Sequence, residues 1–326
     1  MRRSRRSLLA AGLVLMSGTS LFAHAARAQD PKEIRLDWAT YNPVGLLLKE
    51  KGILEEALQA TGIRVRWVQS LGSNKALEFL NAGAIDIGSA AGAAALVARI
   101  NGNPVKAVYA FSRPEWTALV TRKDTGIAKP VDLKGKRIAV TRGTDPHIFL
   151  IRALQGAGLT ERDVKLVLLQ HSDGRTAIDR GDVDAWAGLD PLMAAAEIEN
   201  GDVLFYRDPA ANTWGLLDVR EDFANAHPDL VQTVIAAYER ARAYALANPQ
   251  ALSAALVAAT KLPEPVIARQ LQRTDLSKPM IGPAQAESIE AAGLALQQAG
   301  VIPAGTDVAA AVSGLLDSGF NPVAAR

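Results

Sequence analysis

Polar residues recur in this sequence where a predicted strand gives way to a predicted helix. Six such places carry Ser, Thr, Asn or Asp as a capping residue, at 40–43, 72–74, 88–90, 144–146, 172–174 and 190–191. Helix starts of this kind offer unpaired backbone N–H groups and the positive end of the helix dipole. A cluster of such neutral donors suits a small oxyanion such as a sulfonate, sulfate or nitrate.

Nine residues at or beside these places are candidate ligand contacts. Ser73, Ser89 and the backbone N–H of Ala90 are expected to face Thr144 and His147 across a cleft. Trp116 and Trp186 could form a flat apolar wall for an organic tail. The full set is Asn42, Ser73, Ser89, Ala90, Trp116, Thr144, His147, Trp186 and Asp190. For each of them a structural role, as a cap, a core aromatic or a surface His, is the alternative.

The types and spacing of these residues do not match those of a known catalytic or metal site. Ser89, His147 and Asp145 contain the types needed for a hydrolytic triad, but no Gly-x-Ser-x-Gly turn surrounds Ser89. A metal site from Asp145, His147, His171 and Asp173 lacks the HxxxH or HExxH spacing. The chain contains no Cys, which excludes thiol catalysis and thiolate metal sites. We therefore expect no catalytic centre, no metal and no cofactor.

The elements that position these residues occur twice along the chain. Strands predicted at 34–40 and 65–70 alternate with helices and precede the segment 83–88, and strands at 137–141 and 164–170 precede the similar segment 181–186. Alternation of this kind is typical of a parallel sheet. The sequence thus predicts an α/β fold with two lobes, each a mainly parallel sheet flanked by helices, and a ligand cleft between them.

Two extended segments are expected to connect the lobes. The chain crosses near 112–116 and returns near 213–217, and two crossings make a hinge. From Arg220 onward the pattern is helical without a strand, and this segment is expected to complete the first lobe. The predicted boundaries are 29–114 with 215–326 for the first lobe and 115–214 for the second.

The first 28 residues have the pattern of an export signal. Four Arg precede an apolar stretch, Ala26-Arg27-Ala28 forms a cleavage site, and residues 4–9 resemble a twin-arginine signal, with ordinary Sec export as the alternative. Removing this segment removes five Arg and no acid, so 36 basic and 34 acidic residues become 31 and 34, a charge of about −3. We expect a monomeric periplasmic protein without a lipid anchor, a membrane-spanning helix or a nucleic-acid partner.

Residues 132–140, Gly143-Thr144 with His147, residues 181–186 and Asp190-Pro191 together resemble the aliphatic-sulfonate-binding proteins of ABC importers. The resemblance implies a type II periplasmic-binding-protein fold. It also implies ligand contacts at Ser73, Ser89, Ala90, Thr144, His147 and Trp186, with Asp190 nearby. The chain departs from the family pattern at 88–92, which has fewer hydroxyls, and at Leu189, where an aromatic is usual.

The resemblance predicts a substrate-binding component of an ABC importer, which captures an aliphatic sulfonate for sulfur uptake and delivers it to a membrane permease. Sulfate esters, taurine, nitrate and pyrimidine-type precursors remain alternative ligands. A metal-dependent periplasmic enzyme is the alternative of another class. A cofactor-precursor synthase of similar fold uses a Cys-rich iron motif, which this chain lacks.

Overall fold

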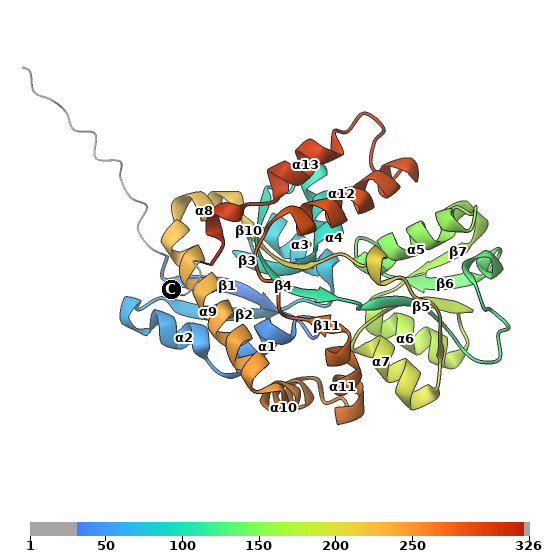
Figure 1. The fold of residues 1–326 in the computed structure, drawn as a ribbon, viewed down its shortest axis with the longest axis horizontal. Coiled ribbons are helices and arrows are strands. Elements are labelled where there is room, and N and C mark those ends of the chain that lie inside the picture. The colour runs from blue at the N-terminus through green and yellow to red at the C-terminus, as the bar shows by residue number, and fades with distance from the viewer. Residues whose placement is uncertain (1–30, 323–326) are drawn as a thin grey trace, which may run out of the picture.

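The computed structural model describes residues 31–322 and contains two β-sheets, each flanked by helices and lying side by side (Figure 1). We name the part built on the first sheet the first lobe and the part built on the second sheet the second lobe. The predicted export signal at 1–28 lies outside the described residues.

The first sheet has six strands in the order β11-β4-β10-β3-β1-β2. Strands β1, β2 and β3 are parallel, and β10 is antiparallel to both β3 and β4. The strands are β1 (Glu33–Trp38), β2 (Arg64–Gln69), β3 (Ile87–Ala91), β4 (Val105–Pro114), β10 (Gly215–Arg220) and β11 (Thr274–Asp275). The helices of this lobe are α1 (Pro43–Glu50), α2 (Ile53–Leu58), α3 (Ser73–Asn81), α4 (Gly92–Ile100), α8 (Glu221–Ala226), α9 (Pro228–Ala247), α10 (Pro249–Thr260), α11 (Glu264–Gln272), α12 (Pro283–Gln298) and α13 (Val308–Leu315).

The second sheet has five strands in the order β7-β6-β8-β5-β9. Strands β6, β7 and β8 are parallel, and β5 is antiparallel to both β8 and β9. The strands are β5 (Thr117–Thr121), β6 (Arg137–Val140), β7 (Lys165–Leu168), β8 (Ala185–Leu189) and β9 (Val203–Tyr206). The helices are α5 (Asp145–Gly156), α6 (His171–Arg180) and α7 (Leu192–Ala195), the last continuing as a π-helical turn (Ala196–Asn200).

Local sequence signals account for several helix starts. Asn42 caps α1, where its Oδ1 accepts a hydrogen bond of 2.9 Å from the Gly45 N–H, and Pro43 occupies the first helical position. Pro228 likewise occupies the first position of α9, which ends at Ala247. Each signal acts within a few residues, so it is readable without knowledge of the tertiary structure.

One prediction about the C-terminal segment is wrong. We expected no strand after Arg220, but Thr274 and Asp275 form β11, which pairs with Pro114 and Arg113 at the end of β4. Two residues are too few to show the alternating pattern that marks a strand. This short pairing places α11 beside the point where the chain crosses between the lobes.

The cores follow the two sheets. One large apolar cluster is centred on the first sheet, with Leu36 and Ile87, and extends to Ile148 of α5 in the second lobe. The second lobe has two clusters, one containing Ile138 and the other containing Trp186. Among residues 31–322, no helix combines the length and the apolar character needed to cross a bilayer.

Gly215, at the start of β10, has no space for a side chain. A Cβ there would lie 2.4 Å from two ring carbons of Phe111. We expect Gly215→Ala to lower the free energy of unfolding by roughly 1–3 kcal/mol, because overpacked sites force neighbouring groups apart. Urea denaturation measures the change. The control is Gly156→Ala, whose added methyl meets nothing within 4 Å; an equal effect of both substitutions would contradict the packing argument.

Candidate functional site

A cavity of about 200 Å³ lies between the two lobes. Its walls come from the carboxyl ends of β1, β2, β7 and β8 and from the connection between α10 and α11, and ligands of open α/β sheets bind at such strand ends. The lining residues are Thr40, Tyr41, Gln69, Ser70, Leu71, Gln170, His171, Ser172, Leu189, Asp190, Pro191, Leu192, Thr260 and Leu262. None of these described residues is Lys or Arg, so an anion here would be held by neutral groups.

Helices α3, α5 and α6 each begin at this boundary without a side-chain cap. The first-turn N–H groups of a helix have no intrahelical acceptor. The starts of the helices lie close together, because a Cβ on Gly72 would be 3.0 Å from Nε2 of His171 and one on Gly143 would be 3.6 Å from Cβ of Asn74. Uncapped starts from both lobes therefore meet, an arrangement suited to binding an anion.

Asp145 binds both segments that cross between the lobes. Its Oδ2 accepts hydrogen bonds from Nε1 of Trp116 (2.8 Å) and the N–H of Thr213 (3.0 Å), and its Oδ1 accepts one from Oγ1 of Thr213 (2.7 Å). Burial raises the pKa of this carboxyl group, and these hydrogen bonds partly offset the effect. The start of α5 is thereby fixed to the hinge.

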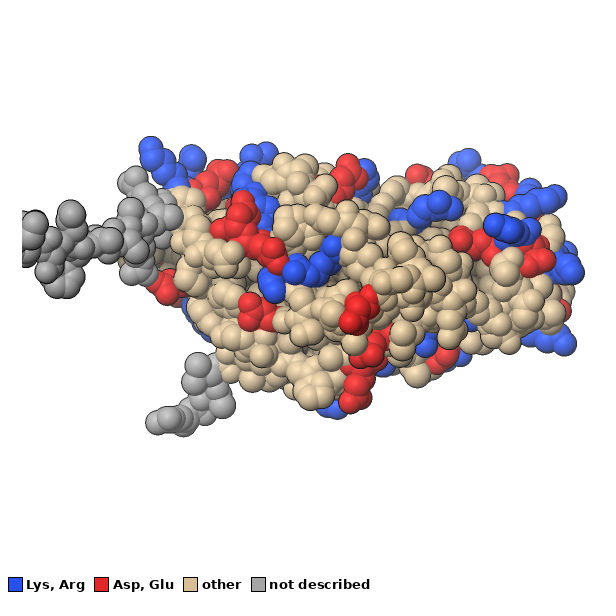
Figure 2. Space-filling view, turned by 90° about the horizontal axis from the view of Figure 1, so that it is seen from above, with Lys and Arg blue, Asp and Glu red and all other residues tan. Residues whose placement is uncertain are grey.

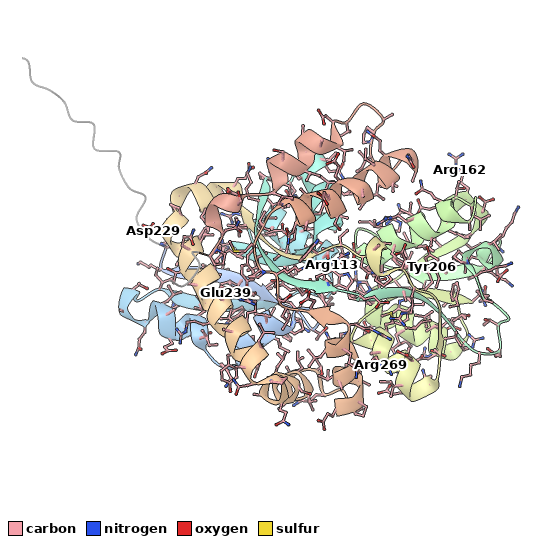
Figure 3. The ribbon with its side chains drawn as sticks, in the orientation of Figure 1. Arg113, Arg162, Tyr206, Asp229, Glu239 and Arg269 are labelled. Carbon is pink, nitrogen blue, oxygen red and sulfur yellow. The ribbon has the colours of Figure 1, made fainter. Side chains whose placement is uncertain are left out.

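Arg113 makes a second contact between the crossing segments (Figure 3). Its Nη1 donates to the carbonyl of Asn212, and its guanidinium lies 5.4 Å from the ring centre of Trp214. The pKa of Arg113 is lowered, chiefly by burial. Arg113 is thus occupied within the hinge and does not line the cavity.

An ionic cluster joins α11 of the first lobe to the second lobe. Arg273 lies 3.3 Å from Oδ1 of Asp190 and also binds Glu197, which in turn pairs with Arg269. Arg269 lies on α11 where this helix approaches the second lobe (Figure 3). Burial raises the pKa of Asp190 to about 6, although the charge of Arg273 lowers it. The carboxylate on the cavity wall is therefore balanced by a neighbouring cation.

The predicted contacts of the first lobe have partners inside that lobe. Oγ of Ser73 accepts from the Ala91 N–H (3.0 Å), Oγ of Ser89 donates to Asp37 (2.8 Å), and Asn42 caps α1. The expectation that 88–90 begin a helix is wrong, because Ser89 and Ala90 belong to β3, whose residues are all buried between β1 and β10. The ligand-binding roles of these residues remain predictions.

The predicted contacts of the second lobe are also buried. Oγ1 of Thr144 donates to the Thr141 carbonyl (2.6 Å), and Nε2 of His147 lies 2.9 Å from Oε1 of Glu161 in the same lobe. Trp186 is completely buried, and its unpartnered Nε1 faces Gly174 of α6. Of the nine predicted residues, Asp190 is the one that lines the cavity, and the roles of the others stay predictions.

Several polar residues line the cavity that the sequence pattern does not single out as ligand contacts. Ser70 and Tyr41 line the cavity from the first lobe, and Gln170 and His171 line it from the second. The internal repeat carried a signal for Ser70 and Gln170, since both follow the second strand of their copy. The predicted helix start at 172–174 is also displaced, because α6 begins at His171 with Gln170 before it.

Two buried carboxyl groups lie in the first lobe behind the cavity wall. Oδ2 of Asp37 accepts hydrogen bonds from Ser70 (2.6 Å) and Ser89 (2.8 Å). Asp218, completely buried on β10, has no hydrogen-bond partner among the described residues. Burial raises the pKa of Asp37 to about 7, and burial together with the charge of Asp37 raises the pKa of Asp218 well above its ordinary value.

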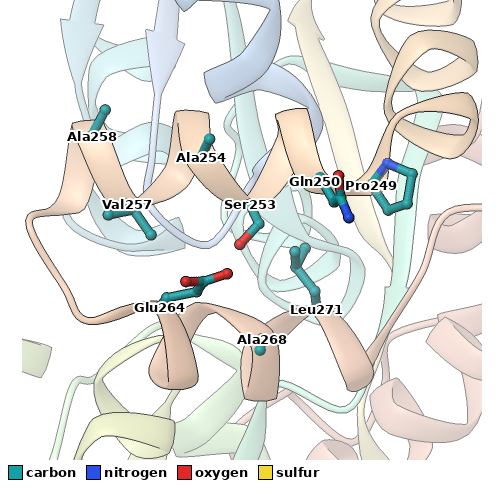
Figure 4. A pocket seen from close by; sticks show the side chains of 9 residues that line it. All are labelled: Pro249, Gln250, Ser253, Ala254, Val257, Ala258, Glu264, Ala268 and Leu271. Atoms are coloured by element: carbon teal, nitrogen blue, oxygen red, sulfur yellow. The ribbon is translucent and has the colours of Figure 1, made fainter.

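A second hollow lies on the outside of the first lobe, away from the uncapped helix starts. This groove of about 520 Å³ runs between α10 and α11 and is lined mostly by small and apolar side chains such as Ala254, Val257 and Ala268 (Figure 4).

On the face in Figure 2, acidic and basic side chains are interspersed, without a broad basic patch. No group of three His, Asp or Glu side chains placed to hold a metal ion occurs within residues 31–322.

A family model described as "NMT1/THI5 like" matches residues 50–252, which is more than half of the chain. The chain belongs to this NMT1/THI5-like family. A relative from Escherichia coli (strain K12), whose name assigns it to the binding of aliphatic sulfonates, is 28% identical over 268 residues, 82% of this chain and 83% of its own length. Another relative, from Aspergillus parasiticus, is named 4-amino-5-hydroxymethyl-2-methylpyrimidine phosphate synthase and is 28% identical over 63% of each chain.

Among solved structures of similar fold is the alkanesulfonate-binding protein SsuA from Xanthomonas axonopodis pv. citri bound to MOPS. It superposes with a TM-score of 0.79 and 26% identity, covering 87% of this chain and 99% of that one. The match confirms the predicted two-lobed fold and the predicted resemblance to sulfonate-binding proteins. The relatives of this chain thus include proteins named for binding and one named as an enzyme.

The two buried carboxyl groups predict an unusual pH dependence of stability. The folded protein holds their protons more tightly than the unfolded chain, so the stability that these two groups contribute is fully present below about pH 4 and is lost as the pH rises through their raised pKa values, which for Asp37 is about 7. We expect Asp218→Asn to raise the free energy of unfolding by roughly 1–3 kcal/mol at pH 8 and to change it little at pH 4, because it removes a charge that burial disfavours.

Thermal denaturation between pH 4 and pH 8 measures this effect, with Asp182→Asn at an exposed position as the control. The explanation fails if Asp218→Asn has the same effect at pH 4 and pH 8.

Proposed function

We propose that this protein is the extracytoplasmic substrate-binding component of an ABC importer, and that it captures a small organic oxyanion, foremost an aliphatic sulfonate. The observation that carries the proposal is the meeting of three uncapped helix starts, from both lobes, beside a cavity without Lys or Arg among its described lining residues. The similarity to sulfonate-binding proteins over most of the chain supports the same ligand class.

Binding would proceed by closure of the two lobes. We propose that residues 29–114 with 215–326 move as one body and residues 115–214 as the other, about the crossing segments bound by Asp145. Closure would bring the first-turn N–H groups of α3 and α6 to the same anion, replacing its water shell with oriented donors. The ionic cluster of Arg269, Arg273, Asp190 and Glu197 would then hold the closed state.

The proposed partner is a membrane permease that receives the ligand, and the proposed location is the periplasm, reached through the predicted signal at 1–28. We assign no catalytic role to the chain. The fungal relative is named as a synthase, but the iron motif expected for that enzyme requires Cys, and this chain has none. Ligands that need an acidic cleft, such as pyrimidine-type precursors, are less favoured because Asp190 is paired with Arg273.

A thermal-shift panel tests the proposed ligand class. We expect ethanesulfonate or a longer alkanesulfonate to raise the melting temperature, since a ligand at 100 times its Kd stabilises the folded state by about 2.7 kcal/mol. Ethyl sulfate, taurine, sulfate and nitrate are measured in parallel and identify the alternative ligands. The proposal is refuted if no member of the panel stabilises the protein.

Closure itself can be tested at Gly72. A Cβ there would lie 2.8 Å from Oδ1 of Asn74 and 3.0 Å from Nε2 of His171, so the substitution crowds the boundary between the lobes. We expect Gly72→Ala to weaken the binding of the best panel ligand by roughly tenfold or more, because overpacking costs about 1–3 kcal/mol. Calorimetric titration gives the Kd.

The melting temperature of the free Gly72→Ala protein should change little, because the contact with His171 arises only where the lobes approach and the Asn74 side chain, within the same lobe as Gly72, can rotate away. Gly305→Ala, where an added methyl meets nothing within 4 Å, is the control. Unchanged affinity in Gly72→Ala would show that binding does not require the two lobes to approach at this point.

A further inference from the structure

His171 is a buried polar residue of the cavity wall to which the proposed function gives no role. It begins α6, is 3% exposed and lines the cavity between the lobes. Its Nε2 is buried and has no hydrogen-bond partner among the described residues. A buried polar atom without a partner is costly in a native structure, so what this atom binds requires an explanation.

The hydrogen bonds of Thr141 fix which ring nitrogen of His171 carries the proton. Oγ1 of Thr141 donates its single proton to the carbonyl of Leu169 at 2.8 Å. Toward Nδ1 of His171, 3.2 Å away, the same oxygen can therefore only accept, so Nδ1 is the protonated nitrogen. Burial lowers the pKa of His171 to about 3, which keeps the ring neutral at ordinary pH. Nε2 is consequently a bare acceptor.

A second acceptor approaches the same point from the first lobe. Oδ1 of Asn74 is also buried without a partner, and the point where Gly72 lacks a Cβ lies 2.8 Å from this oxygen and 3.0 Å from Nε2 of His171. The two atoms are therefore at most 5.8 Å apart, the sum of these distances. Oε1 of Gln170, from another residue of the cavity wall, is a third buried acceptor without a partner.

The boundary between the lobes thus presents both hydrogen-bond donors and unpaired hydrogen-bond acceptors to a ligand. The backbone N–H groups at the helix starts can bind an anionic group, but the lone pairs of His171 and Asn74 repel one. A ligand that satisfies both must carry a negative group and, separately, an N–H or O–H group. An unsubstituted alkyl chain would leave the acceptors unpaired in a closed, dry site.

We propose that His171 is a specificity-determining residue, whose Nε2 accepts a hydrogen bond from an amino or hydroxyl group on the organic part of the bound anion. The ligand class is accordingly an amino- or hydroxy-substituted alkanesulfonate. This inference rests on the proposed function and adds the requirement for a donor on the ligand.

Three sulfonates with the same number of non-hydrogen atoms test the requirement: 2-aminoethanesulfonate, 2-hydroxyethanesulfonate and propane-1-sulfonate. Calorimetric titration gives the Kd of each ligand, and the ratio of interest is the Kd of propane-1-sulfonate divided by that of the tighter donor-bearing ligand. We expect this ratio to be about ten or more, because propane-1-sulfonate leaves a buried acceptor unpaired. His171→Phe should reduce this ratio to about one, and His171→Gln, which keeps an acceptor, should retain part of it. His227→Gln, far from the cavity, should leave the ratio unchanged.

The outcomes separate this inference from the proposed function. If propane-1-sulfonate binds as tightly as both substituted ligands, or if the ratio survives in a folded His171→Phe protein, the role of His171 is refuted while sulfonate binding stands. If no sulfonate binds, the proposed function fails and this inference fails with it. If the His171→Phe protein does not fold, the His171→Gln protein serves instead. A ratio in His171→Gln equal to the wild-type ratio then refutes the role of His171, and a reduced ratio supports it.

Discussion

The buried carboxylate of Asp145 connects the two segments that cross between the lobes. It accepts hydrogen bonds from Trp116 in one crossing segment and from Thr213 in the other, and it lies in the first turn of α5. A carboxylate with these donors is costly to bury and more costly to leave unpaired, so both segments are held at one point. The geometry of the cleft depends on this point, because it fixes the start of α5 to both crossing segments.

The cleft combines hydrogen-bond donors, which act on the ligand directly, with an ionic cluster, which links the two lobes beside the cavity. Helix starts without side-chain caps supply donors that act on a ligand in direct contact, whereas the ionic cluster of Arg273, Asp190 and Glu197 links the lobes beside the cavity. The cations of that cluster are paired with acids, so they add little net positive charge to the cavity. Selection of a ligand therefore depends on the placement of neutral groups, and a small anion whose hydrogen-bonding groups do not match gains little from charge alone.

The sequence was sufficient for the architecture but only partly for the site. The repeated strand-helix pattern predicted the two lobes, and capping signals at 40–43 and 144–146 predicted the starts of α1 and α5, because these depend on neighbouring residues. The pattern did not reveal which side of a strand end faces the cavity. Ser89 follows a turn-like Gly88 yet lies in a buried strand, and Trp186 faces α6 instead of the cavity. His171 was missed because its importance arises from Thr141 and Gly72, which are distant in the sequence and adjacent only in the fold.

The most direct test of the account is to observe the backbone N–H groups at the helix starts while a sulfonate binds. Amide chemical shifts of the protein, recorded by NMR during titration with the tightest-binding sulfonate, should change most at Ser73, Asn74, His171 and Ser172, with smaller changes elsewhere. Shift changes confined to the groove between α10 and α11, or a bound ligand that leaves these four amides unchanged, would contradict the claim that uncapped helix starts from the two lobes hold the anion.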